Sequence, residues 1–308
     1  VAMTGNIGIE GGGARYGHLQ TWGYNYHGMM QKPPAGSVGM KGAGGPVGEF
    51  VSDSGEKSEY SDRALNINQT AQGILDASEP PVRMLWVASK NPFAQDFDRN
   101  KMIKAFEKLE MVVCVDQFFN ETVQHADIVL PVTTTFEQWD VSSSYWHYWL
   151  SVNEPAIKPL YECKSDPEIA ALLSKTINKL EAGSCTFPQE FDAKRWLDQE
   201  FNEGMGKQFG IAGWDDLLEG PRKAKMVSTA AWYDRKFKTP SGKYEFKSER
   251  CAENGHTALP EYKAGAQGAL PFHLFTPHLQ YGLHSQFVNL DWMQVFWPEP
   301  FVYIHPSA

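Results

Sequence analysis

The sequence predicts an α/β protein built on a parallel β-sheet. Three short apolar runs carry this prediction, at residues 82–87, 111–115 and 128–130. Short runs of this kind are typical of strands that are buried on both faces. Between the first two runs, apolar residues recur at helical spacing from about Asn100. Strands that alternate with helices favour a parallel sheet with helices on both faces.

Local signals bound each of these elements. The first strand lies between the proline pair at 80–81 and the turn-like residues 89–92. The helix after it would bury Met102, Phe106 and Leu109, which share one face at a period of 3.6 residues. The third strand stops at a proline, which cannot donate to a ladder of hydrogen bonds.

A second strong helix begins at Asp166, which we expect at its N-cap, with Pro167 at the first helical position. Gly183 marks its end. Apolar residues at helical spacing predict its buried stripe: Ile169, Leu172, Leu173, Ile177 and Leu180. Helix capping explains Asp166 without a ligand, and a ligand contact there is equally compatible with the pattern.

Residues 1–48 are rich in glycine, with polar and aromatic residues between the glycines. Two interpretations stay open for this segment. It is either a flexible surface loop, or a backbone that lies close against a large polar ligand, where only glycine allows the approach.

Composition excludes several classes of protein. The chain has 308 residues, with 28 Lys and Arg against 37 Asp and Glu, and a formal net charge of −9. An acidic chain without a basic stripe is a poor ligand for nucleic acid or anionic membranes. Its apolar runs fall short of the roughly 18 residues of a membrane helix. The four cysteines are far apart, so neither an iron–sulfur cluster nor a structural zinc site is encoded here.

Polar residues follow two of the predicted strands. Ser89, Lys90 and Asn91 come after the first strand, and Asp116 directly follows the second. Parallel sheets bind ligands beyond the carboxyl ends of their strands. Asp116 could therefore accept hydrogen bonds from a ribose or a base edge, or it could only cap the following turn. The glycine fingerprint of a dinucleotide site is absent after both strands.

The second half is less regular. We expect a helix near residues 191–201 and a tight turn at 239–242 that leads into a strand. Residues 251–270 read as a linker. Strand-like runs at 272–276 and 301–304 predict a second domain.

Four stretches resemble the molybdopterin oxidoreductases of the dimethyl sulfoxide reductase superfamily. They are Thr4-Gly5-Asn6-Ile7-Gly8 with Gly11-Gly12-Gly13 and Gln20; Leu85 to Pro92; Val113 to Thr122 with Ala126 to Pro131 and Glu137; and Thr239 to Glu245 with Leu274 to His278, His284 and Ser285. The third stretch is the most specific, since its order of strand, Asp, aromatic, Glu-Thr, Ala-Asp and Leu-Pro is rarely reached by chance.

The resemblance implies a domain organisation. Residues 1–250 would be part of a Rossmann-like molybdopterin-binding domain, and 251–270 a linker. Residues 271–308 would begin a β-barrel that binds the dinucleotide end of the cofactor. The metal ligand (Cys, selenocysteine or Ser) and the iron–sulfur domain of the family are expected upstream of Val1.

The resemblance also implies a cofactor, molybdopterin guanine dinucleotide, with two copies holding molybdenum or tungsten. Asp116 and Asp166 would bind the guanosine edges, Asn91 and Val115 would line that slot, and Gln20 would reach the pterin. The remaining contacts expected from the resemblance are Lys90, Thr276, His278, His284 and Ser285. No catalytic residue and no metal ligand is assigned within this chain.

Three positions depart from the family pattern. Ser89 stands at the family's glycine before Lys90-Asn91-Pro92, Asn120 replaces a usual threonine, and Pro277 replaces a usual glycine.

The expected function is that of a fragment of a molybdenum or tungsten oxidoreductase that transfers an oxygen atom or a hydride equivalent in anaerobic respiration. Formate and sulfur, nitrogen or arsenic oxyanions are the candidate substrates, and an iron–sulfur subunit is the expected electron-transfer partner. Alternatives are a non-redox tungstopterin lyase of the hydratase type and a non-catalytic nucleotide-binding module. The sequence leaves localisation open.

Overall fold

The computed structural model describes residues 1–13, 65, 67–78, 81–143, 148–201, 203–225, 230–265 and 272–306. Gln20 lies outside the described residues. The elements, with 3-10 helices marked η, are η1 Ala2–Thr4, η3 Ile67–Gln69, α1 Thr70–Asp76, β1 Met84–Ala88, α2 Pro92–Gln95, α3 Arg99–Lys108, β2 Met111–Asp116, η4 Val123–His125, β3 Ile128–Pro131, η5 Thr135–Glu137, β4 Asp140–Ser143, β5 Trp149–Asn153, α4 Asp166–Leu180, α5 Ala193–Glu200, α6 Glu203–Phe209, η6 Trp214–Glu219, β6 Arg222–Lys223, α7 Glu249–Glu253 and α8 Met293–Phe296.

The chain divides into two compact units. One contains the described parts of Val1–Asn25, Val141–Val152 and Phe201–Thr276. The other contains the described parts of Tyr26–Asp140, Asn153–Glu200 and Pro277–Ala308, and it holds the sheet that the sequence predicts.

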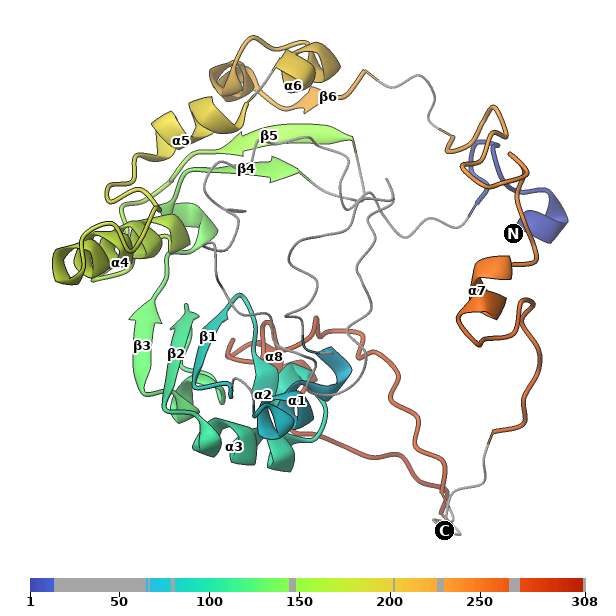
Figure 1. Ribbon diagram of the computed structural model, residues 1–308, viewed down its shortest axis with the longest axis horizontal. Coiled ribbons are helices and arrows are strands. Elements are labelled where there is room, and N and C mark those ends of the chain that lie inside the picture. Colours follow the sequence, from blue (N-terminus) through green and yellow to red (C-terminus); the bar gives the residue numbers. More distant parts are fainter. Residues whose placement is uncertain are drawn as a thin grey trace. The chain divides into compact units, whose positions relative to one another are not determined.

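The predicted parallel sheet is confirmed. Strands β1, β2 and β3 lie side by side in that order (Figure 1). Both pairs are parallel, with Trp86 opposite Val113 and Val113 opposite Ile128. At the carboxyl end, Asp116 lies opposite Pro131.

One face of this sheet packs against α1 and α3. Val87, Val112 and Cys114 on the strands join Met102 and Phe106 of α3 in one buried cluster. The spacing of four residues between Met102 and Phe106 places both on the same side of the helix. The ammonium of Lys108 caps the carboxyl end of α1, where it donates a hydrogen bond to the carbonyl oxygen of Leu75 at 2.6 Å.

The opposite face of the sheet is partly open. Val113 and Val115 are buried there, but Trp86 and Ile128 remain 39% and 44% exposed. Helices on both faces therefore stay a prediction for this second face.

A bridge extends the sheet beyond β3. Val132 pairs in parallel with Lys164, and the backbone N–H of Thr133 donates to the Lys164 carbonyl oxygen over 3.1 Å. Helix α4 starts directly after this bridge, so its first turn lies at the carboxyl edge of the sheet.

Two details of α4 differ from the sequence predictions. Its N-cap is Ser165, not Asp166, because the Ser165 side chain and the Glu168 side chain form a capping box. The predicted stripe is wrong beyond Ile169, and Leu180 is 86% exposed. Ser174 is buried instead, because its hydroxyl donates to the Phe187 carbonyl oxygen over 2.6 Å.

A second small sheet, in the order β4, β5, β6, lies mainly in the unit that contains the described parts of Val1–Asn25, Val141–Val152 and Phe201–Thr276. β5 pairs antiparallel with β6, with Leu150 opposite Arg222. Leu150 is fully buried, and Met205, Phe209 and Leu217 pack around it. In the unit that holds the parallel sheet, α5 confirms the helix expected near residues 191–201.

The strands expected near the carboxyl terminus are not formed. Residues 272–276 and 301–304 have no strand structure, and neither do residues 243–246 after the turn at 239–242. A strand needs a partner for its backbone groups, and no described segment pairs with these runs. The start of a β-barrel at 271–308 therefore stays a prediction. Helix α7 also occupies the first residues of the predicted linker.

Among the described residues, no helix has both the length and the apolar character needed to span a lipid bilayer.

Candidate functional site

The candidate site is the carboxyl edge of the parallel sheet. The loop 89–91 follows β1, Asp116 ends β2, Thr133 follows β3, and Ser165 follows the bridge at Lys164. Neighbouring strands lie about 4.8 Å apart. Asp116 and the first turn of α4 are two strand positions apart, so they are separated by about 10 Å along this edge.

Asp116 holds the turn that follows it. One of its carboxylate oxygens accepts the backbone N–H of Phe118 at 3.0 Å, and the other accepts the side-chain amide of Asn120 at 2.7 Å. The capping interpretation is thereby confirmed. A carboxylate offers about four lone-pair positions, so roughly two remain free for a ligand. The half-buried Asp116 side chain is therefore compatible with both interpretations.

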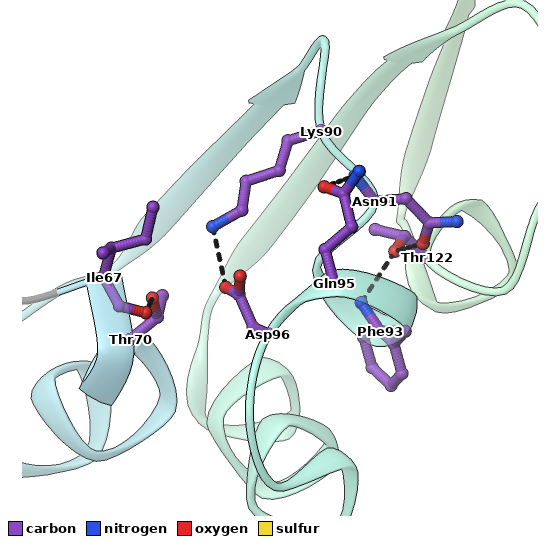
Figure 2. A network of polar contacts seen from close by, with 8 residues as sticks. All are labelled: Ile67, Thr70, Lys90, Asn91, Phe93, Gln95, Asp96 and Thr122. Atoms are coloured by element: carbon purple, nitrogen blue, oxygen red, sulfur yellow. Dashed lines mark hydrogen bonds and ion pairs between the residues drawn. The ribbon is translucent and has the colours of Figure 1, made fainter. Parts of the chain in front are cut away.

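The loops after β1 and β2 are tied together by side chains. The hydroxyl of Thr122 donates to Oδ1 of Asn91 at 2.5 Å, and it accepts the backbone N–H of Phe93 at 3.2 Å. Figure 2 shows these contacts between the two loops. Asn91 is only 6% exposed, and its own N–H donates to the side chain of Gln95. Asn91 therefore holds the loops after β1 and β2 together, independently of any ligand.

Lys90 points away from Asn91 and toward Asp96 (Figure 2). Its ammonium lies 2.8 Å from the Asp96 carboxylate, which is nearly buried. In this arrangement Lys90 stabilises the loop after β1. Its expected cofactor contact stays a prediction.

Val115 and Asp166 lie near the ends of elements that reach this edge, Val115 in β2 and Asp166 at the first position of α4. Val115 is the last buried residue of β2. Its side chain can therefore affect a ligand at the edge only through the residues that pack on it. Asp166 is exposed in the first turn of α4, where a carboxylate is favoured by the helix dipole. It is free to face a ligand because Ser165 does the capping.

Cys114 is not a nucleophile in this site. Burial, followed by the charge of Asp116, raises the pKa of its thiol to about 11. The group is therefore protonated at neutral pH.

The residues expected from the barrel side lie in an irregular segment. Thr276 and His278 are exposed, and Nδ1 of His278 lies 2.7 Å from the neighbouring carbonyl oxygen of Leu279. His284 and Ser285 sit in the short turn between Leu283 and Gln286. Their expected contacts with the cofactor stay predictions.

Behind the edge lies Glu137, which the sequence analysis named only as part of the family resemblance and to which it assigned no role. Glu137 is buried, and its carboxylate accepts the backbone N–H of Thr134 and that of Leu160, at 2.8 and 2.7 Å. These bonds, with that from the Thr134 hydroxyl, lower the pKa of Glu137. Glu137 therefore joins the chain after β3 to the segment that leads to α4. The capping-box spacing from Thr134 to Glu137 was the signal in the sequence.

The glycine-rich start of the chain lines a cavity of about 260 Å³ in the unit that does not hold the parallel sheet. Trp232 and Tyr244 complete its wall. A Cβ at Gly8 would collide with the carbonyl oxygen of Trp232, so this glycine is needed for close backbone packing. Among residues 1–13, close approach of the backbone thus accounts for Gly8; residues 14–48 lie outside the described residues.

Within the described part of the chain, no cluster of His, Cys, Asp and Glu could hold a metal ion.

Comparison with known proteins identifies the family. The model of the molybdopterin oxidoreductase family matches residues 1–176, which include β1, β2 and β3. The chain belongs to the molybdopterin oxidoreductase family. The match covers the sheet and its carboxyl edge, and the resemblance read from the sequence is confirmed.

Two curated proteins of known sequence align with almost all of this chain. A probable oxidoreductase of Bacillus subtilis is 27% identical over 94% of the chain and 40% of its own length. A dimethyl sulfoxide/trimethylamine N-oxide reductase of Cereibacter sphaeroides is 28% identical over 92% of the chain and 38% of its own length. The chain thus spans about two fifths of these relatives. Among solved structures, acetylene hydratase from Pelobacter acetylenicus matches 65% of the chain and 26% of its own length, at 20% identity and a TM-score of 0.48.

Ser89, directly after β1, is held in a strained backbone conformation. Ser89 has a φ of 54°, a left-handed conformation that costs a residue with a Cβ about 1–2 kcal/mol. We expect Ser89→Gly to raise the free energy of unfolding by about 0.5–1 kcal/mol. Glycine relieves the backbone strain, and its greater freedom in the unfolded chain offsets part of that gain. Urea unfolding measures this. Ser89→Ala, which keeps the Cβ, should leave it nearly unchanged, and an equal gain in both variants would contradict the strain.

Glu137 makes stability depend on acid pH. Because folding lowers its pKa, its contribution is fully present above the unfolded pKa of about 4.3 and is lost as pH falls through the lower folded value. Glu137→Gln should lower the melting temperature at pH 7 and flatten its decline below about pH 4.3. Melting curves between pH 3 and 7 test this. The exposed control Glu154→Gln should follow the wild-type curve. Parallel curves for wild type and Glu137→Gln would show that Glu137 does not carry the effect.

Proposed function

We propose that this chain is part of a molybdenum or tungsten oxidoreductase with two molybdopterin guanine dinucleotides, and that the carboxyl edge of its parallel sheet holds the guanine end of one of them. The observation that carries the proposal is Asp116, whose carboxylate is fixed at that edge and keeps lone pairs free. Family membership supplies the class of cofactor.

The chemistry of Asp116 fits a guanine edge. Guanine presents N1–H and N2–H₂ side by side, and a carboxylate accepts both with charge-assisted hydrogen bonds. Phe118 and Asn120 take only one bond on each oxygen. Adenine presents an acceptor at N1, which a carboxylate would repel. The edge therefore favours guanine.

Asp166 supplies a second carboxylate, two strand positions away and exposed at the start of α4. At about 10 Å it cannot bind the same base edge as Asp116. Its place suits hydroxyl groups of the sugar, which donate to carboxylates. Asn91 and Val115 would form the inner wall of the slot between these two carboxylates.

When bound, the cofactor would supply the redox chemistry, with a metal that cycles between the +4 and +6 states to transfer an oxygen atom or a hydride equivalent. The residues of this chain would bind and orient its organic tail. One of the named relatives is a dimethyl sulfoxide/trimethylamine N-oxide reductase, so small sulfur and nitrogen oxides are the proposed substrates. An iron–sulfur subunit is the proposed electron partner.

Asp116 can be tested in this chain with guanosine monophosphate as the probe. We expect Asp116→Asn to weaken binding about tenfold to a hundredfold, because the amide loses the charge and sets a donor against a donor. Calorimetric titration gives the affinity. The control Asp98→Asn, at the N-cap of α3, keeps an equivalent cap and should bind like the wild type. Equal binding by all three proteins would refute the role of Asp116.

The redox function requires the intact protein. The full-length polypeptide that contains this chain, purified with its cofactor, should oxidise reduced viologen dye when trimethylamine N-oxide or dimethyl sulfoxide is added. The chain by itself should not, because the part expected to ligate the metal lies outside it. Turnover by the chain alone, or hydration of a substrate by the intact protein without dye oxidation, would contradict the proposal.

A further inference from the structure

Asn120 stands between the Asp116 carboxylate and the start of η4. Its Nδ2 donates to Asp116 at 2.7 Å. Its Oδ1 accepts the backbone N–H of Thr122 at 3.0 Å and that of Val123 at 3.1 Å. The side chain thus bonds with both ends of its amide.

These bonds fix which way the amide points. A backbone N–H can only donate, so the two N–H groups at Thr122 and Val123 require the oxygen of Asn120 to face them. The NH₂ group must then face Asp116. The orientation follows from fixed donors of the main chain, and the reversed amide would set donors against donors on one side and two acceptors together on the other.

We propose that Asn120 is a positioning residue that holds the Asp116 carboxylate for recognition of the guanine edge. This inference rests on the proposed function of Asp116. A free aspartate side chain samples several rotamers, and fixing one of them on binding has an entropic cost. Asn120 and the N–H of Phe118 hold one oxygen each, so much of this ordering is already present before a ligand binds.

The same bonds connect Asp116 to the other side of the slot. Asn120 holds the backbone of Thr122, and the Thr122 hydroxyl holds Asn91 at 2.5 Å. Asp116, Asn120, Thr122 and Asn91 therefore form one continuous chain of hydrogen bonds across two strands. Asn120 thereby ties the Asp116 carboxylate to the loop that carries Asn91.

Asn120→Asp separates this role from the fold. An aspartate keeps the oxygen that accepts from Thr122 and Val123, but it replaces the donor to Asp116 with a second carboxylate oxygen. We expect a small change in melting temperature, at least a tenfold loss of affinity for guanosine monophosphate, and a smaller preference for it over adenosine monophosphate. Asn120→Thr, which keeps a hydroxyl donor, should retain most of the affinity and preference.

The control is Gln124→Ala, on the exposed surface of the same turn, which should bind like the wild type. Ribose 5-phosphate, which lacks the base, is the second probe, and its binding should be unchanged in Asn120→Asp. If Asn120→Asp does not fold, Asn120→Ser, which keeps a hydroxyl, and Asn120→Ala, which has none, replace it. The serine variant should then bind guanosine monophosphate more tightly than the alanine variant.

Two results would overturn the inference while Asp116 keeps its role: wild-type affinity in the variants without a donor, or an equal loss for guanosine monophosphate and ribose 5-phosphate. A wild-type chain that does not bind guanosine monophosphate at all would overturn both this inference and the proposed guanine site.

Discussion

The parallel register of β1, β2 and β3 is the constraint on which the rest of the structure depends. Because the three strands run in one direction, every loop that leaves a carboxyl end starts from the same edge. The bridge between Val132 and Lys164 adds the first turn of α4 to this edge. Burial of Val112, Cys114 and their neighbours against α3 fixes the register, since a slip by one residue would turn apolar side chains to the other face. The loops after β1, β2 and β3, which are far apart in the sequence, therefore lie along the same edge of the sheet.

The side chains on this edge serve the fold and the proposed ligand together. Asp116 holds its own turn, Asn91 holds Thr122, and Lys90 pairs with Asp96. Such bonds remove much of the freedom that a ligand would otherwise have to restrict. Asp116 and Asp166 both combine a place at this edge with carboxylate oxygens that remain accessible. In the proposed site these two carboxylates carry the recognition, and Asn120 and the N–H of Phe118 hold Asp116 in place.

The family match covers the part of the chain that carries the candidate site. The matched residues 1–176 contain the sheet, the loops at its carboxyl edge and Glu137. Glu137 holds the return from β3 toward α4 through hydrogen bonds with Thr134 and Leu160. In the other unit, Gly8 allows the backbone at Trp232 to approach closely. Each of these features is an element of backbone packing.

The sequence by itself determined the parallel sheet, α3, the start of α4 and the family, because apolar periodicity and short motifs are local properties. It placed Asp116 and Asn91 at the ends of strands for the same reason. Only the tertiary structure decided that Ser165 caps α4, that most of the α4 stripe stays exposed and that Asn120 bridges Asp116 to Thr122. The runs at 272–276 and 301–304 show the limit most clearly: their composition favours strands, but a strand forms only when another segment pairs with its backbone. Pairing, burial and side-chain contacts join residues across the chain, and no local pattern contains them.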